Sequence, residues 1–302
     1  MAADAFRIAL AQYPIGRPAS FEEYAANLGQ WVSRAAAEGA ELLVFPEYGS
    51  MELASLFGPE VEAGLDRQIA EVAGLESRVD ELHSALARES GVYILAASIP
   101  ARTAAGHVNR ARLFGPRGGV GRQDKTVMTR FENEEWSVMP GAGLQLFETS
   151  LGQIGVCICY DIEFPLVARA LCEGGAELLL APSCTDTAAG YHRVRTGALA
   201  RALENQCHVA VAPTVGLAPW LPSVDVNVGA AGLYGPSDTG FPPTGILVEG
   251  EPDTPGWVYA EVDPARVRKA RTEGQVLNSR DWRRQPGAGA LALPQPGRMR
   301  VD

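Results

Sequence analysis

Residue types that mark several classes of protein are scarce in this sequence. Five of the 302 residues are cysteines, and this odd, sparse set indicates free thiols in a reducing cytoplasm rather than a disulfide framework. No cluster of five or more lysines and arginines occurs, and the net charge is −10, so a basic surface for nucleic acid is not expected. We therefore expect a cytoplasmic protein that does not bind nucleic acid.

Long hydrophobic runs and targeting signals are also missing. The apolar stretch at residues 91–101 is far shorter than the roughly 18 residues that a membrane-spanning helix needs. Residues 1–7 carry no basic segment that leads into an apolar one, so no secretory signal is expected there. Membranes are therefore not among the expected partners.

Motifs of several common enzyme classes are absent as well. The chain contains no G-x-S-x-G, H-E-x-x-H or G-x-x-x-x-G-K-[ST] motif, and GVG at residues 119–121 lacks the third glycine of a dinucleotide-binding fingerprint. Cys157 and Cys159 would share one face of a strand, but no second pair of cysteines or histidines with ligand spacing accompanies them. We therefore expect neither a metal ion nor an organic cofactor.

The composition that remains is that of a globular protein, with 46% hydrophobic and 21% charged residues. Apolar runs such as residues 42–45 and 154–158 predict strands, whereas apolar residues at helical spacing between positions 69 and 86 predict an amphipathic helix. PRGG at residues 116–119 predicts the turn of a hairpin. This alternation predicts an α/β fold with a mixed sheet, in one domain over residues 1–284 followed by a Pro/Gly-rich tail at residues 285–302.

Three residues suited to catalysis stand at the ends of predicted strands. Cys159 ends a strand and precedes a helix, and backbone N–H groups at such a corner favour a thiolate and an oxyanion. Glu47 follows one apolar strand and Lys125 follows another. Ligands gather beyond strand ends in parallel-type sheets, so these distant residues are able to converge. Together they supply a base, a cation and a nucleophile.

The segments around these residues resemble the nitrilase, or carbon–nitrogen hydrolase, superfamily. The matching motifs are FPE at residues 45–47, RQDK at residues 122–125 and GVCICYDIEFP at residues 155–165. The resemblance extends over about residues 5–275. It implies a four-layer α-β-β-α sandwich, a catalytic triad of Glu47, Lys125 and Cys159, and a homodimer or higher homo-oligomer. A helix near residues 166–173 and the C-terminal tail are the interface candidates.

The resemblance also implies a second carboxylate beside the triad. Glu132, Glu134 and Glu135 compete for this role. Glu134 is the choice because it stands two residues before Trp136, as the family arrangement suggests, and Glu132 is the alternative.

The implied chemistry is hydrolysis of a carbon–nitrogen bond through a thioester. Glu47 would take the Cys159 proton, and Lys125 and the backbone N–H of Tyr160 would stabilise the oxyanion. The implied substrate is a linear amide of a small metabolite, which releases ammonia or an amine. The side chains expected to shape its pocket are those of Tyr48, Trp136, Cys184 and Trp220.

Other functions stay open at this point. A nitrilase, an N-acyltransferase or a carbamoylase would use the same triad, and the fold could instead serve as a non-catalytic binding module. A Cys-His hydrolase built on His192 or His208 is a further alternative.

Overall fold

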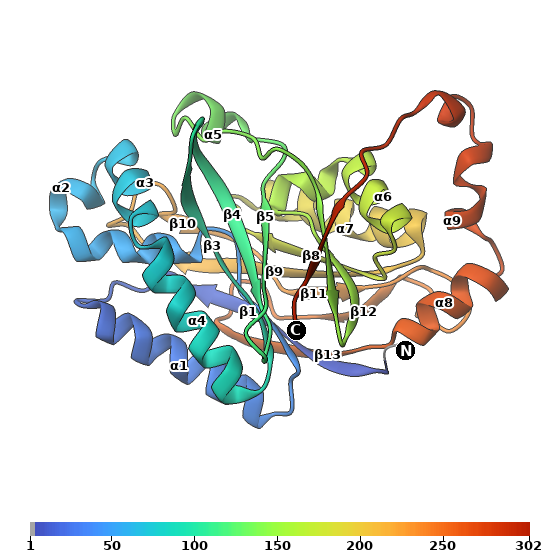
Figure 1. The fold of residues 1–302 in the computed structure, drawn as a ribbon, viewed down its shortest axis with the longest axis horizontal. Coiled ribbons are helices and arrows are strands. Elements are labelled where there is room, and N and C mark those ends of the chain that lie inside the picture. Colours follow the sequence, from blue (N-terminus) through green and yellow to red (C-terminus); the bar gives the residue numbers. More distant parts are fainter. Residues whose placement is uncertain (1–3) are drawn as a thin grey trace.

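Two β-sheets flanked by helices make up the computed structural model, which describes residues 4–302 (Figure 1). The first sheet has the strand order β13 (Gly256–Val262), β1 (Phe6–Pro14), β2 (Leu42–Val44), β3 (Tyr93–Thr103), β4 (Gly106–Phe114) and β5 (Val120–Asp124). The second has the order β14 (Gly297–Arg300), β6 (Gln145–Thr149), β7 (Gly152–Val156), β8 (Leu178–Ser183), β9 (His208–Leu217), β11 (Gly232–Tyr234) and β12 (Ile246–Glu249). The sheets join where the end of β1 pairs in parallel with β9, and β10 (Val226–Asn227) also pairs with β9.

Helices cover the outer sides of both sheets. Figure 1 shows α1 to α4 at one end of the molecule, α6 to α9 toward the other, and α5 above the strands. The early helical segments are α1 (Phe21–Ala37), η1 (Gly49–Phe57), α2 (Pro59–Glu62), α3 (Leu65–Ala73) and α4 (Glu76–Ser90). The later ones are α5 (Arg130–Glu134), η2 (Cys159–Glu163), α6 (Pro165–Gly174), α7 (Ala188–Asn205), α8 (Pro264–Glu273), α9 (Asn278–Asp281), η3 (Trp282–Arg284) and η4 (Ala288–Ala290).

Side-chain alternation along β1 shows how the layers are built. Ile8 and Leu10 belong to a buried cluster that includes apolar residues of both sheets. Ala9 and Ala11 point to the opposite face and join a second cluster with residues of α1, α3 and α4. Successive side chains of a strand point to opposite faces, so β1 contributes to two apolar layers at once. The predicted α/β fold, with helices outside a pair of sheets, is confirmed.

Local signals read from the sequence explain where several elements begin and end. The Ser20 hydroxyl accepts a hydrogen bond from the backbone N–H of Glu23 and so caps α1. The predicted hairpin is confirmed, because β4 and β5 pair antiparallel with Phe114 opposite Val120. Phe45 and Pro46 follow β2, and the residue before a proline is biased away from helix, so Glu47 stands just beyond the end of the strand.

The C-terminal segment contributes a strand to the second sheet. β14 pairs in parallel with β6, and the next residue, Val301, is fully buried in the cluster between the sheets. The hydroxyl of Tyr93 in β3 donates a hydrogen bond of 3.1 Å to the carboxylate of Asp302. Strand pairing and burial therefore attach the end of residues 285–302 to the rest of the fold.

Over residues 4–302 no helix combines the length and the apolar character needed to cross a membrane.

Candidate active site

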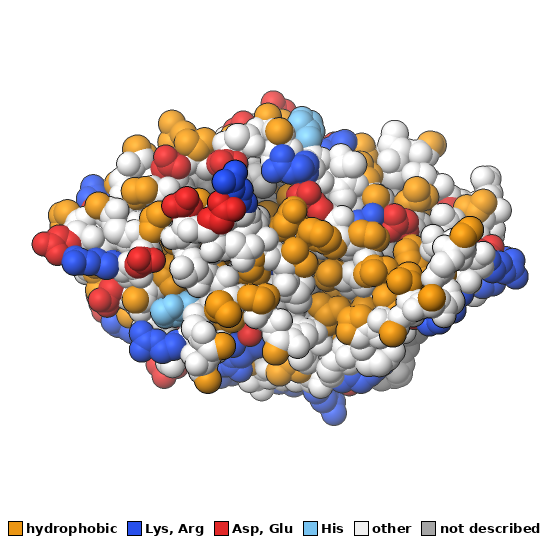
Figure 2. All heavy atoms as spheres, turned by 90° about the horizontal axis from the view of Figure 1, so that it is seen from above, with side chains coloured by type: hydrophobic (Ala, Val, Ile, Leu, Met, Phe, Trp, Pro, Cys, Tyr) orange, Lys and Arg blue, Asp and Glu red, His pale blue; other side chains and the backbone are white. Residues whose placement is uncertain are grey.

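A cavity of about 680 Å³ opens at the ends of several strands. Its floor carries Glu47, Lys125, Cys159 and Tyr160, and further wall residues come from α5, the start of α7 and the loop before β10. Figure 2 views the molecule from the side on which α5 lies and shows charged side chains of both signs beside a broad apolar area. The cavity thus brings together the three residues that the sequence pattern selected.

Strand ends deliver these three residues to one place. Glu47 follows β2, Lys125 follows β5, and Cys159 begins η2 after β7. All three are buried, with at most 5% of each residue exposed. Cys159 has φ of 47°, a left-handed conformation that is uncommon for a residue other than glycine and that recurs at functional corners.

Two carboxylates share the Lys125 ammonium. Its Nζ donates to Glu47 Oε1 at 2.8 Å and to Glu132 Oε2 at 2.6 Å. Burial alone would lower the pKa of Lys125, but the charges of Glu47 and Glu132 outweigh it and raise that pKa well above its ordinary value. Lys125 is therefore a permanent cation in the floor of the cavity.

The second carboxylate is Glu132, so the choice of Glu134 is wrong as a matter of geometry. Glu134 points away from the cavity and pairs with Arg130 at 2.7 Å on the exposed side of α5, where more than half of each side chain is accessible. Glu135 is exposed as well. Residues two apart on a helix do not face the same way, so Glu132 and Glu134 cannot both reach Lys125.

A capping box explains why Glu132 turns inward. Thr129 is the N-cap of α5, and its hydroxyl accepts from the backbone N–H of Glu132. Glu132 Oε2 in return accepts from the Thr129 backbone N–H at 2.9 Å. This T-x-x-E pattern is visible in the sequence and is the local signal that singles out Glu132 among the three glutamates.

The Glu47 carboxylate is held at both oxygens. Oε1 accepts from Lys125, and Oε2 accepts from the backbone N–H of Cys184 at 3.1 Å. Burial raises the pKa of Glu47 to about 7, although the neighbouring Lys125 opposes this rise. A carboxyl group with this pKa is suited to accept and return a proton near neutral pH.

Cys159 contacts the backbone of the same residue, Cys184. Its Sγ is 3.7 Å from the Cys184 carbonyl oxygen, to which it donates. Burial, followed by the charge of Glu47, raises the pKa of the Cys159 thiol well above its ordinary value. The resting group is therefore a thiol that needs a base. Cys157 is fully buried in the apolar cluster between the sheets and does not line the cavity.

Asp161 is a residue of this region to which the sequence pattern assigned no role. Its buried carboxylate accepts from the Thr126 hydroxyl at 2.8 Å, from the Val127 N–H at 2.8 Å and from the Ile158 N–H at 3.1 Å. It therefore ties the segment after Lys125 to the corner that carries the cysteine. Its place inside the CYD motif at residues 159–161 was the available signal.

The expected pocket residues divide into two groups. Tyr48, Trp136 and Cys184 line the cavity, and the Tyr48 hydroxyl donates to Glu132 Oε1 at 2.8 Å. Trp220 is not among the lining residues and lies against the guanidinium of Arg17 instead. The prediction for Trp220 is therefore wrong.

The histidines do not support the Cys-His alternative. No histidine within residues 4–302 lines the cavity. His208 lies 3.3 Å from the Asp263 carbonyl oxygen, and burial lowers its pKa to about 4. His192 lines a different hollow along α7.

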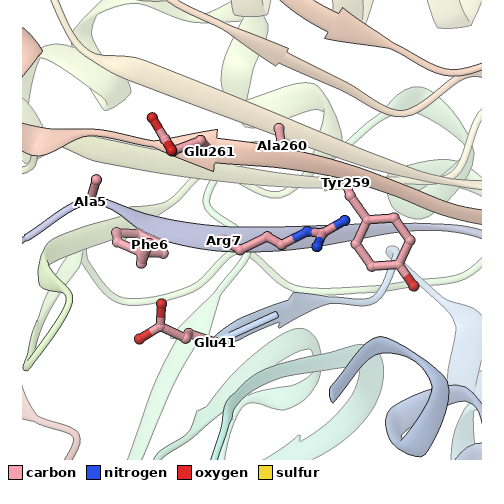
Figure 3. Close-up of a pocket in the computed structure, with 7 residues that line it drawn as sticks. All are labelled: Ala5, Phe6, Arg7, Glu41, Tyr259, Ala260 and Glu261. Carbon is pink, nitrogen blue, oxygen red and sulfur yellow. The ribbon is translucent and has the colours of Figure 1, made fainter. Parts of the chain in front are cut away.

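A second hollow, drawn in Figure 3, differs from this site in its chemistry. It has about 400 Å³ and is lined by residues at the start of β1 and the end of β13, together with Glu41. Arg7 stacks over the Tyr259 ring at 4.8 Å and donates to the Glu38 carbonyl oxygen. The lining contains no thiol or lysine, so it offers no nucleophile of the kind found in the first cavity.

Among the described residues, no group of three or more His, Cys, Asp or Glu side chains is arranged to hold a metal ion.

The model of the carbon–nitrogen hydrolase family matches residues 7–272 of this chain. The chain belongs to the carbon–nitrogen hydrolase family. It is 33% identical over 278 residues to a probable hydrolase, YhcX, of Bacillus subtilis, in a match that covers 92% of this chain and 54% of the relative. The chain thus spans about half the length of that relative. It is also 26% identical to the omega-amidase NIT2 of Danio rerio, with 91% of this chain and 94% of the relative covered.

Solved structures of this family share the fold. Nit3 of Saccharomyces cerevisiae, described as a member of branch 10 of the nitrilase superfamily, superposes with a TM-score of 0.72 at 22% identity, over 92% of this chain and 97% of that one. A mutant amidase from Nesterenkonia sp. AN1, with acrylamide added to its active-site cysteine, gives a TM-score of 0.68 at 24% identity, over 92% and 99% of the two chains.

Proposed function

We propose that this protein is a cysteine-dependent amidase that hydrolyses a linear amide of a small metabolite. The observation that carries the proposal is that nucleophile and base both contact the backbone of one residue, Cys184. The Cys184 N–H donates to Glu47 Oε2, and the Cys184 carbonyl oxygen accepts from Cys159 Sγ. This contact puts thiol and carboxylate side by side on the floor of a cavity.

The first half of the proposed reaction forms a thioester. Glu47 takes the Cys159 proton, and the thiolate attacks the amide carbonyl carbon. The ammonium of Lys125 and the backbone N–H of Tyr160 stabilise the oxyanion of the tetrahedral intermediate. Glu47 then returns the proton to the departing nitrogen as the carbon–nitrogen bond breaks.

The second half releases the acid. Glu47 takes a proton from water, and the resulting hydroxide attacks the thioester carbonyl. The thiolate leaves and recovers the proton from Glu47, which returns the enzyme to its starting state. Glu132 holds Lys125 in place throughout, because its Oε2 accepts from Nζ.

The substrate class rests on the cavity and on the relatives. A cavity of about 680 Å³ falls within the range of about 300–1,000 Å³ that is usual for small-molecule sites. One relative is named an omega-amidase, and the Nesterenkonia amidase carries its adduct on a cysteine. Both relatives support an enzyme that hydrolyses amides rather than a non-catalytic binding module.

Ammonia release from a panel of linear amides, nitriles and carbamoyl compounds tests the proposal. We expect turnover of an amide by the parent and by Cys157→Ala, and none by Cys159→Ala. Mass spectrometry after a rapid acid quench should place the acyl group on Cys159. An adduct on Cys157, or full activity of Cys159→Ala, would overturn the assignment.

The same panel distinguishes the alternatives. Release of ammonia only from nitriles would indicate a nitrilase. Release of ammonia only from carbamoyl compounds would indicate a carbamoylase. Transfer of the acyl group to added hydroxylamine in preference to water would indicate an N-acyltransferase.

We also propose that the protein works in the cytoplasm as a homodimer. The five cysteines are free thiols, which suits a reducing compartment. On the proposed interface helix α6, Leu166 is 40% exposed. Light scattering at micromolar concentration should give about twice the chain mass of 32.1 kDa, whereas a value near the chain mass would contradict the dimer.

A further inference from the structure

Asn109 in β4 contacts both carboxylates of the site. It is fully buried, and its Nδ2 donates to Glu47 Oε1 at 2.9 Å and to Glu132 Oε1 at 3.4 Å. Its backbone carbonyl oxygen accepts from the Lys125 N–H at 2.9 Å. One residue therefore holds the two acids by its side chain and the lysine by its backbone.

The amide and the ammonium form two parallel bridges between the same acids. Lys125 joins Glu47 Oε1 to Glu132 Oε2, whereas Asn109 joins Glu47 Oε1 to Glu132 Oε1. Both donors thus meet the same oxygen of Glu47. The other oxygen, Oε2, accepts from the backbone N–H of Cys184, and Cys159 Sγ contacts the carbonyl oxygen of the same residue.

We propose that Asn109 is a positioning residue, which holds Glu47 by Oε1 so that Oε2 is the oxygen that takes the Cys159 proton. This inference rests on the proposed function and deepens it, because it names which oxygen of the base reacts and what holds it. Asn109 acts through Glu47 and need not touch the substrate.

The orientation of the amide supports this role. Oδ1 of Asn109 is buried and has no hydrogen-bond partner among residues 4–302. A reversed amide would turn this oxygen toward two carboxylates, which would repel it. A buried polar atom without a partner destabilises a fold, so a residue kept only for packing would be expected to satisfy both ends of its amide.

The contact has a predictable electrostatic effect. A hydrogen bond donated to a carboxylate favours its charged form and lowers its pKa. Removing the Asn109 amide should therefore raise the pKa of Glu47. The other titratable groups that act on Glu47 are Lys125, Glu132, Tyr48, Cys159 and Cys184. All of them stay in place when only Asn109 is changed.

The test compares pH profiles of Asn109→Ala and Asn109→Asp with the parent. Glu47 must be ionised to act as a base, so the acid limb of kcat/KM should move to higher pH by about one unit in Asn109→Ala. Asn109→Asp preserves the side-chain shape but adds a third acid, and its limb should move at least as far. We expect kcat near neutral pH to fall on the order of 10-fold or more, with partial recovery above the shifted limb.

Asn205→Ala is the matched control. Asn205 is also a fully buried asparagine, but its amide donates to the Arg201 carbonyl oxygen within α7. The acid limb of the kcat/KM profile of Asn205→Ala should coincide with that of the parent. A uniform loss of activity without a shift in Asn109→Ala and Asn109→Asp would assign Asn109 to packing and overturn the proposal.

A readout that needs no substrate separates this inference from the proposed function. The rate of Cys159 alkylation by iodoacetamide, followed by peptide mass spectrometry, reports proton transfer from the thiol to Glu47. Its pH dependence should shift in the Asn109 variants even if no amide in the panel is hydrolysed. If Asn109→Ala does not fold, Asn109→Asp decides. Unfolding of both variants under conditions in which Asn205→Ala is native would overturn the proposal.

Discussion

Two buried glutamates five residues apart, Glu47 and Glu52, have similar pKa values but different neighbours. Burial raises the pKa of each to about 7. Glu47 contacts the Lys125 ammonium and lines the cavity. Glu52 lies within η1 and accepts from two neutral donors, the Tyr13 hydroxyl and the Gly16 backbone N–H, each at 2.7 Å.

This comparison separates a perturbed pKa from a functional site. Desolvation is enough to bring either carboxyl group to a proton affinity useful near neutrality. Chemistry also needs a nucleophile within reach, a cation for the oxyanion and room for a substrate. Glu47 has a thiol, an ammonium and a cavity beside it, whereas Glu52 does not line the cavity. A raised pKa is thus a poor indicator of catalysis when it is considered without its neighbours.

The largest expected difference between the two glutamates is in turnover. Glu47→Gln removes the proposed base and should lower kcat by about 10³-fold or more. Glu52→Gln should retain kcat within a few fold, because Gln has the same shape, its oxygen can accept from the Gly16 N–H and its NH2 group can donate to the Tyr13 hydroxyl oxygen. Steady-state ammonia release measures both. Equal losses of kcat in the two variants would mean that both substitutions lower activity by disturbing the folded structure, and that Glu47 has no separate role in the reaction.

Substitution of Lys125, the cation that contacts Glu47 and not Glu52, should have the next largest effect. Lys125→Ala should lose on the order of 10²-fold or more in kcat. Lys125→Arg should lose nearly as much, because a planar guanidinium needs more room than the ammonium enclosed between Glu47 and Glu132. Single-turnover kinetics on the best amide gives the rate of acylation directly. Near-normal acylation by either variant would remove Lys125 from the mechanism.

The second carboxylate should have a smaller effect. Glu132→Gln weakens the hold on Lys125 and should reduce kcat on the order of 10-fold or more, since hydrogen bonds between charged groups are the stronger ones. Glu134→Gln is the matched control on the same helix and should behave like the parent. Kinetics at saturating substrate compares the two. A crippled Glu134→Gln beside a normal Glu132→Gln would contradict the geometry.

Glu52 should affect stability and not turnover. Its pKa of about 7 in the folded state lies above the ordinary value of 4.5, so the folded protein binds the extra proton between these values. The free energy of unfolding of the parent should therefore fall by about 3 kcal/mol, relative to Glu52→Gln, as pH rises from about 4.5 to 7. Chemical denaturation across this range measures the difference. A constant difference between the two proteins would show that Glu52 titrates normally.

Local patterns in the chain were sufficient to predict the three residues that meet in the cavity. Apolar runs ended by Pro46 or by a polar residue mark where strands stop, and a residue that follows a buried strand is delivered to the edge of a sheet. Glu47, Lys125 and Cys159 were therefore identifiable from the motifs around them. The α/β alternation and the β4–β5 hairpin follow from the same short-range signals.

Contacts between distant segments were decided only by the tertiary structure. The capping box of Thr129 and Glu132 is a local exception, since it is visible in the sequence and turns Glu132 rather than Glu134 toward the lysine. Asn109 and Asp161 gain their partners from strands and loops that are remote in sequence, and no local pattern reports such hydrogen bonds. Chain order and apolar spacing thus determine which residues reach the sheet edge. Side-chain direction and hydrogen bonding across the folded core determine which of them contact one another there.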